Sequence, residues 1–534
     1  MEFNITEQKK YYVNGIPKQW DGPVMKVYSP ILTNGVATYM GSYPMMDKDA
    51  ALTQLDCTIK AYDKGRGKWP CMSVENRCQY VMKFIKGMES KRKEVVTLLM
   101  WEIGKNFQDS CKEFDRTVEY LEETVKVAMD MDKSYKEIKN DGGILAQIKR
   151  APLGVTLCMG PYNYPLNESL TTIIPALIAG NVVIAKPPKI GVLLHYPLLE
   201  VFMESFPVGV FNMVYGDGPT VISPLLESGK IDVLAFIGSS KVGDILKKQH
   251  PHPHRLRCVM GMEAKNPAII LRDADLSLTI NECLAGALSY NGQRCTALKI
   301  LFVHEYIVGD FVERFAKAVD GLKCGLPWED GVQITPLPEP GKIDYLNGLI
   351  DDARKVIKSD MEAGLPLIQC KSGEVRVYGS VGTLTKNGKV VMNESWGEDP
   401  NYLTLFKPAV VFPVNEKMRL YKEEQFGPIV PIVPFKYESD VMDYIVNSNY
   451  GQQVSIFGND PDMIREMTSQ LVNQVCRVNI NCQCQRGPDT YPFTGRKDSA
   501  EGTLSITDAL RVFSIRTMVA TKDGNLNKKL MMSL

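Results

Sequence analysis

From Gly143 onward, short runs rich in β-branched residues alternate with longer segments whose apolar residues have helical spacing. Strands separated by crossover helices of about a dozen residues form a parallel sheet with helices on both faces. Such a doubly wound sheet binds ligands beside the carboxyl ends of its strands. The alternation therefore predicts an α/β fold. We expect strands at 153–161, 181–188, 208–216 and 233–240, and a helix at 166–180.

A second alternation begins near residue 266 and predicts a second α/β domain, with strands at 266–271 and 299–305. Before the first alternation, residues 47–140 are expected to be mostly helical. Residues 371–400 are polar and glycine-rich, and we expect an inserted surface hairpin there. Residues 511–521 alternate like a strand without a neighbouring partner, so we expect that strand to add to another subunit's sheet.

The charge balance excludes several classes of function. Lysine plus arginine and aspartate plus glutamate number 62 each, so no global field attracts nucleic acid or an acidic membrane. The chain shows neither a long apolar span nor the apolar core of a signal peptide. Its 13 cysteines are scattered without metal spacing, and only 5 histidines are present. We therefore expect a cytoplasmic protein with reduced thiols, no membrane span and no metal site.

The segment N-G-Q-R-C-T-A at 291–297 places Cys295 between the end of an expected helix and the start of a strand. A thiol in such a turn can be exposed while its backbone stays fixed, and a thiolate attacks carbonyl carbon. Taken alone, Cys295 is better explained as a buried structural thiol. Other motifs in the chain favour the reactive thiol over the structural one.

Five ordered motifs together resemble the aldehyde dehydrogenase superfamily over roughly residues 10 to 520. They are P-Y-N-Y-P (161–165), K-P-P-K (186–189), F-I-G-S-S-K-V-G (236–243), G-Q-R-C (292–295) and E-E-Q-F-G-P (423–428). The resemblance implies a Rossmann-like cofactor domain (1–122 and 146–260) and an α/β catalytic domain (261–480). It also implies a small bridging arm (123–145 and 481–534) that joins subunits into a homo-oligomer, either a dimer or a tetramer.

The same resemblance implies a thioester mechanism. Cys295 would attack an aldehyde to form a thiohemiacetal, and Asn163 would donate its amide N–H to the oxyanion. After oxidation, water would hydrolyse the thioester. Without the flanking motifs, Asn163 is better explained as a loop residue that caps the next helix.

The resemblance also assigns cofactor contacts, and one of them indicates NADP. Relatives that prefer NAD have a glutamate at the position of Lys189, where it accepts bonds from the ribose hydroxyls. A lysine instead attracts a 2′-phosphate, so we expect NADP rather than NAD; the alternative is a solvated surface lysine. Gln425 departs mildly from the usual proline. The implied cofactor residues are Lys186, Lys189, Gly216, Gly238, Ser239, Glu424 and Phe426.

Within the superfamily, the chain is most similar to the non-phosphorylating glyceraldehyde-3-phosphate dehydrogenases. By that resemblance, Arg116, Tyr164, Arg294 and Arg486 converge on the phosphate of a phosphorylated aldehyde. Guanidiniums aimed into one pocket would repel each other unless a dianion joined them, and arginine binds phosphate in a bidentate manner. The expected reaction is oxidation of glyceraldehyde 3-phosphate to 3-phosphoglycerate, with another acidic aldehyde as the alternative substrate. The alternative is that each arginine lies in a separate surface ion pair.

One departure affects the final step. The family's general base is the glutamate of E-L-G-G-K, and the corresponding stretch here is G-M-E-A-K at 261–265, so Gly261 replaces it. Such a base contributes roughly 10² to 10⁴-fold. Either Glu263 or Glu168 takes its place, or no base exists. In the last case deacylation is impaired, or another acceptor such as coenzyme A takes the acyl group.

Overall fold

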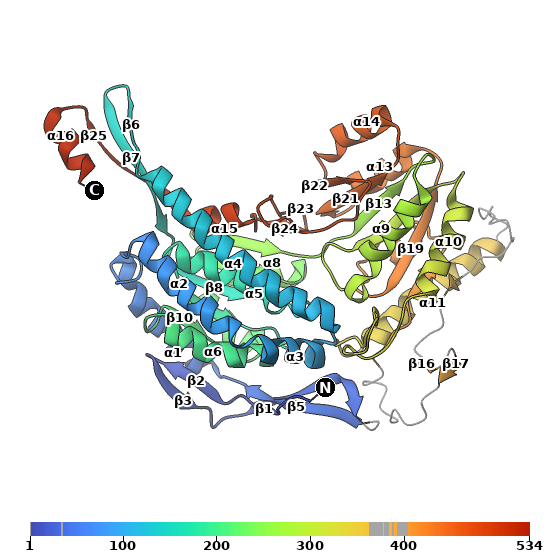
Figure 1. The fold of residues 1–534 in the computed structure, drawn as a ribbon, viewed down its shortest axis with the longest axis horizontal. Coiled ribbons are helices and arrows are strands. Elements are labelled where there is room, and N and C mark those ends of the chain that lie inside the picture. The colour runs from blue at the N-terminus through green and yellow to red at the C-terminus, as the bar shows by residue number, and fades with distance from the viewer. Residues whose placement is uncertain are drawn as a thin grey trace.

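The computed structural model describes residues 2–33, 36–362, 377–378, 384–386, 389–391 and 404–533. Two α/β lobes lie side by side, and a narrow arm that carries the C-terminus extends from the first lobe (Figure 1). The chain ahead of the lobes adds further strands that the sequence does not predict. They are β1 (Thr6–Glu7), β2 (Lys10–Val13), β3 (Ile16–Gln19), β4 (Val24–Thr33) and β5 (Val36–Pro44).

The first lobe is organised around a sheet with the strand order β10-β9-β8-β11-β12-β24. Its neighbouring strands are parallel except β24, which runs antiparallel to β12. Continuous burial of β8, β9 and β11 is typical of a sheet covered on both faces. The four expected strands are confirmed. The strands are β8 (Val155–Met159), β9 (Val182–Lys186), β10 (Phe211–Met213), β11 (Val233–Ile237), β12 (Arg257–Gly261) and β24 (Ala500–Glu501).

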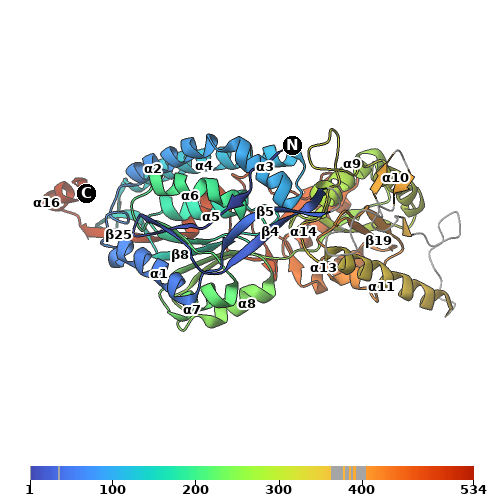
Figure 2. The same cartoon turned by 90° about the horizontal axis from the view of Figure 1, so that it is seen from below.

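Helices cover both faces of this sheet, which confirms the doubly wound class. Figure 2 shows α2, α4 and α6 on one side and α1, α7 and α8 on the other. α2 begins at the cap residue Ser73 and buries Val81, Phe84, Ile85 and Met88 at helical spacing. The helices are α1 (Lys48–Tyr62), α2 (Val74–Glu89), α3 (Arg92–Ile103), α4 (Phe107–Tyr135), α5 (Asn167–Ile178), α6 (Tyr196–Ser205), α7 (Ser223–Glu227) and α8 (Ser240–Gln249).

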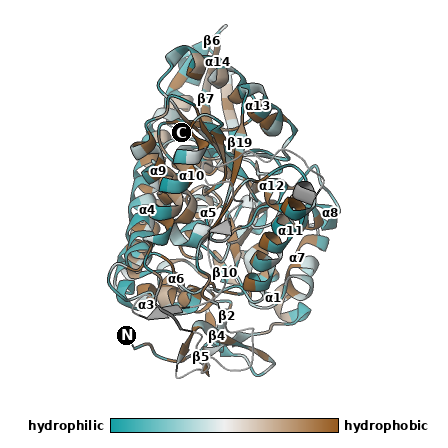
Figure 3. Cartoon of the chain, turned by 90° about the vertical axis from the view of Figure 1, so that its right-hand side faces the viewer, coloured by the Kyte–Doolittle hydropathy of each residue, from teal (hydrophilic) through white to brown (hydrophobic). Residues whose placement is uncertain are grey.

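The second lobe has a sheet with the order β15-β18-β19-β14-β13-β21-β22. Figure 3 shows hydrophobic residues gathered along β19 in the interior. The strands are β13 (Asn266–Ile270), β14 (Leu298–His304), β15 (Val377–Tyr378), β18 (Ala409–Val411), β19 (Ile429–Phe435), β21 (Gln453–Phe457) and β22 (Arg477–Ile480). The helices are α9 (Leu276–Leu288), α10 (Val308–Asp320), α11 (Lys342–Glu362), α12 (Arg419–Lys422), α13 (Glu438–Asn447) and α14 (Pro461–Leu471).

The C-terminal strand has a partner strand within the chain, so the premise that it is unpaired is wrong. β25 (Ser514–Lys522) pairs antiparallel with β7 (Ile144–Pro152) of the same chain, and β7 pairs with β6 (Ile138–Asp141). The partner is distant in sequence, which is why the local pattern does not reveal it. Residues 481–534 also divide: β24 joins the first sheet, and α15 (Ile506–Val512) contacts α4 and α5. Only β25 and α16 (Asn525–Met532) extend with the arm (Figure 1).

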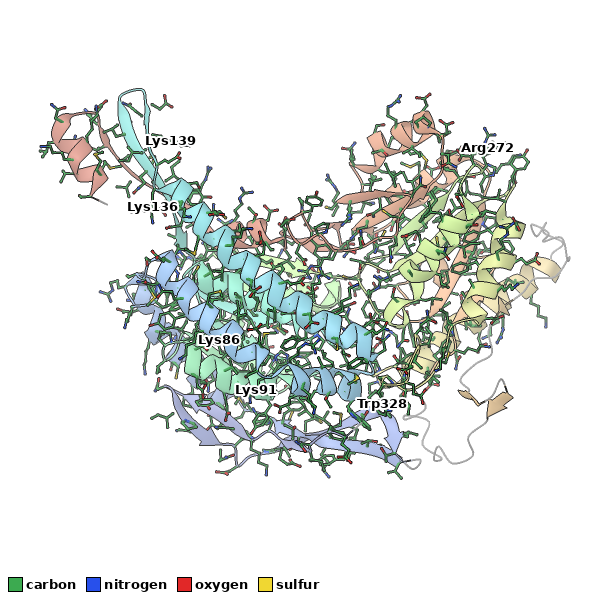
Figure 4. The ribbon with its side chains drawn as sticks, in the orientation of Figure 1. Lys86, Lys91, Lys136, Lys139, Arg272 and Trp328 are labelled. Carbon is green, nitrogen blue, oxygen red and sulfur yellow. The ribbon has the colours of Figure 1, made fainter. Side chains whose placement is uncertain are left out.

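Most of the expected hairpin at 371–400 lies outside the described residues. Within that range, β16 (Leu384–Lys386) and β17 (Lys389–Val391) form an antiparallel pair. The two lobes meet at an aromatic contact between Trp101 of α3 and Trp328, whose ring centroids are 4.5 Å apart. Trp328 is labelled at this junction in Figure 4. Large apolar rings there help to fix the relative position of the lobes.

Candidate active site

The two sheets present opposite edges to each other. The parallel strands of the first lobe end at Met159, Lys186, Ile237 and Gly261, so their carboxyl ends share one edge. Cys295 precedes β14 and lies at the amino edge of the second sheet. A cavity of about 690 Å³ is lined by residues from both edges. That volume is common for sites that bind small molecules.

Most residues that the sequence assigns to the site line this cavity. They are Arg116, Asn163, Tyr164, Glu168, Gly238, Ser239, Glu263, Arg294, Cys295, Glu424, Phe426 and Arg486. The structure places Lys186, Lys189 and Gly216 outside this lining. Lys186 is the last residue of β9, Lys189 follows that strand and Gly216 follows β10, so all three still belong to the same sheet edge.

A strained turn leads to Cys295. Tyr290, Asn291 and Gly292 have φ angles of 49°, 56° and 70°, a region that residues other than glycine rarely adopt. Asn291 stabilises the turn from within: its Nδ2 donates to the Thr335 carbonyl at 3.1 Å, and the Thr335 N–H donates to its Oδ1 at 2.9 Å. Strain of this kind persists only where the surroundings hold it, and it is common at functional sites.

Two donors hold the carbonyl oxygen of Cys295. Asn266 Nδ2 donates at 2.8 Å and Lys299 Nζ at 3.0 Å. Lys299 also forms an ion pair with Glu424, with Nζ 2.8 Å from Oε1. Burial raises the pKa of the Cys295 thiol above that of a free cysteine, and the Lys299 ammonium opposes the rise. Burial therefore favours the protonated thiol over the thiolate at this position.

Asn163 lies beside the same turn. Its Nδ2 donates to the carbonyl oxygen of Gln293 at 2.8 Å. Gln293 lies two residues before Cys295, so this bond orients the Asn163 amide beside the Cys295 turn. An amide nitrogen carries two hydrogens, so the other can donate to a substrate oxygen. Asn163 follows β8 and precedes α5, whose first residue is Asn167. The loop between strand and helix thus presents the donor to the cavity.

The arginines converge on the cavity, but the premise that they lack partners is wrong. Arg116 forms a bidentate pair with Asp489, at 2.9 Å from Nε and 2.7 Å from Nη2. Arg486 pairs with Glu168, and its Nε lies 3.5 Å from an Asp489 oxygen. These carboxylates cancel two of the positive charges. Repulsion between guanidiniums is therefore no argument for a dianion at this site.

The arginines still line the cavity, where their guanidinium groups can bind an anion. Arg294 donates through Nη2 to the carbonyl oxygens of Ala285 and Gly286, at 3.0 Å and 2.8 Å. Its Nε is buried and, among the described residues, has no hydrogen-bond partner, and the same is true of Arg486 Nε. Unsatisfied buried donors cost free energy, and a ligand oxygen would satisfy them. Burial lowers the pKa of Arg486 to about 10, and Asp489 opposes that fall.

Both candidate general bases are engaged elsewhere. Glu263 accepts a hydrogen bond at 2.7 Å from the backbone N–H of Ser240, at the start of α8. Glu168 is held by Arg486. Gly261 lines the cavity, and a Cβ built there would approach only the Ile237 side chain, at an ordinary 3.7 Å. The position of the family's base is therefore open to a side chain although none is present.

The lysines at the end of β9 and just after it are suited to bind a phosphate group. Lys186 is buried, and burial together with the nearby Lys189 lowers its pKa to about 8. Lys189 is exposed. An anion between these ammonium groups would relieve their repulsion. Gly216 has a φ of 129° and packs against Met46 and Val221, which explains the glycine without a cofactor.

The other cofactor candidates line the cavity itself. Ser239 caps α8 by accepting from the Val242 N–H, so the helix N-terminus faces the site beside Gly238. A phosphate there would compete with the Glu263 carboxylate for the Ser240 N–H. Glu424 accepts from the Ala264 N–H at 3.1 Å. Phe426 packs edge-on against Tyr162, with centroids 6.0 Å apart.

Sequence reasoning missed Lys299 and Asp489, which contact site residues directly. Lys299 follows Cys295 by four positions, and no recognised motif includes it. Asp489 meets Arg116 across 373 residues, a pairing that no local pattern can indicate. Within the described ranges, no cluster of three or more potential metal ligands was found. In the same ranges, no helix combines the length and apolar character needed to cross a bilayer.

Comparisons with known proteins agree with this geometry. The model of the aldehyde dehydrogenase family matches residues 22–371 and 366–519. NADP-dependent glyceraldehyde-3-phosphate dehydrogenase of Streptococcus equinus is 30% identical, covering 97% of this chain and 98% of that protein. The enzyme of the same name from Bacillus halodurans C-125, solved with NADP, has a TM-score of 0.81 at 27% identity and covers 97% and 99% of the two chains. This chain therefore belongs to the aldehyde dehydrogenase family.

Proposed function

We propose that the chain oxidises glyceraldehyde 3-phosphate to 3-phosphoglycerate with NADP, through a thioester on Cys295. The observation that carries this proposal is that Cys295 and Asn163 share one cavity with Arg116, Arg294 and Arg486. The similarity to enzymes named NADP-dependent glyceraldehyde-3-phosphate dehydrogenase supports the same substrate and cofactor.

In the acylation half, the thiolate of Cys295 attacks the aldehyde carbon, and the carbonyl oxygen takes the negative charge. Asn163 donates to that oxygen, and losing one such donor costs about 10²- to 10³-fold in rate. NADP, when bound, supplies the two-electron acceptor. The acyl group then remains on Cys295 as a thioester.

The arginines bind the other end of the substrate. Arg116, Arg294 and Arg486 line the cavity, where their guanidinium groups can bind the phosphate. Arg116 supports Arg486 through their shared neighbour Asp489, which lies within ion-pair distance of both. The carboxylates of Asp489 and Glu168 limit the excess positive charge, so the cavity remains stable before a substrate arrives.

Lys186, at the end of β9, and Lys189, just after that strand, favour NADP. The exposed ammonium of Lys189 attracts a 2′-phosphate, and Lys186 lies near it. At the start of α8, Glu263 and the cofactor compete for the Ser240 N–H.

The decisive experiment measures NADPH formation from glyceraldehyde 3-phosphate in buffer free of phosphate and coenzyme A. We expect a burst equal to the concentration of Cys295, followed by a slower steady state, because Gly261 leaves no side chain at the position of the family's base. Release of 3-phosphoglycerate should equal NADPH formed in the steady state. Absence of the burst would contradict the proposal.

A second candidate follows from Gly261 itself. Because both nearby glutamates are engaged, the thioester persists and an external thiol such as coenzyme A takes the acyl group. In that case NADPH formation stops after the burst and resumes when coenzyme A is added. Steady turnover without coenzyme A excludes this candidate.

We also propose that the protein acts in the cytoplasm, at a step of glycolysis, as a homodimer or homotetramer. Every cysteine in the described part of the chain is a free thiol, which fits a reducing compartment. β25 is the edge strand of the arm and exposes Ile515 and Met518. An exposed apolar edge favours association with a second copy.

A further inference from the structure

Lys105 and Glu113 form an ion pair whose side chains are both 0% exposed. Lys105 lies in the connection between α3 and α4, and Glu113 lies in the second turn of α4. Buried ion pairs add little to net stability, because desolvation offsets the attraction between the charges. Since stability alone does not explain the pair, its contacts indicate what it does.

The pair holds the loop that carries Asn163 at two points. Lys105 Nζ donates to the carbonyl oxygen of Asn163 at 2.8 Å. Glu113 Oε1 accepts from the N–H groups of Leu166 and Asn167, at 3.1 Å and 3.2 Å. The loop from β8 to α5 therefore has one charge-assisted anchor at its middle and another where it enters α5.

The same ammonium reaches the turn that carries the nucleophile. Lys105 Nζ lies 4.3 Å from the centroid of the Tyr290 ring and 3.6 Å from that of Tyr164. Tyr290 opens the strained turn before Cys295, and Tyr164 follows Asn163 directly. Cation–π contacts strengthen when the cation is desolvated, as it is here.

We propose that the Lys105–Glu113 pair holds the Asn163 amide in position beside Cys295 during acylation. This inference rests on the proposed function of those two residues. Lys105 and Glu113 are positioning residues, because they act through the Asn163 loop and the Tyr290 turn. Removing the pair should slow the step in which an oxyanion forms and leave the reactivity of the thiol itself unchanged.

Two reagents separate these effects without cofactor or aldehyde. p-Nitrophenyl acetate transfers its acetyl group to Cys295: the sulfur–carbon bond forms, the ester bond breaks, and p-nitrophenolate leaves after an oxyanion intermediate. Iodoacetamide alkylates the same thiolate by displacing iodide, and no oxyanion forms. For Lys105→Met we expect acylation by the ester to slow about 10²-fold. Alkylation of Cys295 by iodoacetamide should stay within about threefold of the unchanged protein.

A double-mutant cycle tests whether Lys105 acts through Asn163. Asn163→Ala alone should slow ester acylation by about 10²-fold or more. In the Lys105→Met background, the same change should cost less than about tenfold, because the amide is already misplaced. Losses that multiply would overturn the proposal. So would equal slowing of acylation and alkylation, which indicates general disruption.

Two further variants keep the test decisive. If Lys105→Met does not fold because Glu113 stays charged and unpaired, Lys105→Met/Glu113→Gln buries no charge and should show the same selective loss. Arg92→Met is the matched control, because Arg92 joins α3 to α4 through Asp115 at 2.7 Å on the exposed side. Its ester acylation should be unchanged. These assays need neither glyceraldehyde 3-phosphate nor NADP, so failure of the proposed function does not disturb them.

Discussion

The acylation and deacylation regions of the cavity are organised very differently. Around Cys295 and Asn163, the side-chain nitrogens of Lys105, Asn266 and Lys299 donate to backbone carbonyl oxygens and fix the groups that they contact. On the deacylation side, position 261 has no side chain, and the nearest glutamates bind other groups. Under the proposed function, the contrast teaches that the groups assigned to thioester formation are held in place, whereas Glu263 and Glu168, the candidate bases for its hydrolysis, are bound to other groups.

The largest expected effect comes from restoring the missing carboxylate. Gly261→Glu meets only an ordinary contact at its Cβ, so we expect it to fold. Steady NADPH formation should rise by about 10²- to 10⁴-fold if hydrolysis limits turnover. The burst should not change, since acylation does not use this position. Stopped-flow absorbance of NADPH measures both phases.

Gly309→Glu is the matched control for that substitution. Gly309 lies in α10, and a Cβ there has no neighbour within 4 Å. It introduces the same charge away from the cavity, so both kinetic phases should match the unchanged protein. A folded Gly261→Glu variant with unaltered steady turnover would break the comparison between the two regions.

The pH dependence of Cys295 alkylation tests the acylation region. Burial raises the pKa of the Cys295 thiol, so its thiolate fraction at neutral pH is lower than that of a free cysteine. Below that pKa, the thiolate fraction rises about tenfold per pH unit. Alkylation of Cys295 by iodoacetamide should therefore rise about 10²-fold from pH 7 to pH 9. Peptide mass spectrometry follows the labelling, and a rate that is flat above pH 7 would contradict the raised pKa.

Cofactor preference tests cofactor binding separately from acylation and deacylation. Lys189→Glu should lower the preference for NADP over NAD by about 10- to 100-fold, because a charged hydrogen bond contributes about 1.5–3 kcal/mol. Ester acylation of Cys295 should stay the same. Affinity for NADP should also fall above about pH 8, where Lys186 loses its proton. Titration calorimetry measures both, with the exposed Lys230→Glu as control; an unchanged preference would contradict the lysine assignment.

The smallest expected effects come from the two engaged glutamates. Glu168→Gln and Glu263→Gln should each keep steady turnover within about threefold, since neither carboxylate is free to act as a base. Glu168→Gln should also lower the KM for the phosphorylated aldehyde modestly, because it removes a competitor for Arg486. A fall of about 10²-fold in either variant would identify that residue as the base and revise the contrast.

The sequence predicts the fold and the identity of most cavity residues better than their electrostatics. Alternating strands and helices predict β8 to β11 because burial on both faces demands continuous apolar runs. β12 escapes prediction because it mixes buried and exposed residues, and the β7–β25 pairing escapes it because the two strands are hundreds of residues apart. The carboxylates of Asp489 and Glu168 beside the arginines are equally non-local, so the expected repulsion was wrong.

The pairing of β7 with β25 has a consequence for synthesis in the cell. β7 ends at Pro152, whereas β25 begins only at Ser514. At ribosomal rates of about 5–20 residues per second, roughly 20 to 70 seconds separate the emergence of the two strands. During that interval the nascent chain carries an open strand edge, which another polypeptide can occupy. A stop codon before residue 514 would make that transient exposure permanent, and chaperones would bind such truncated products.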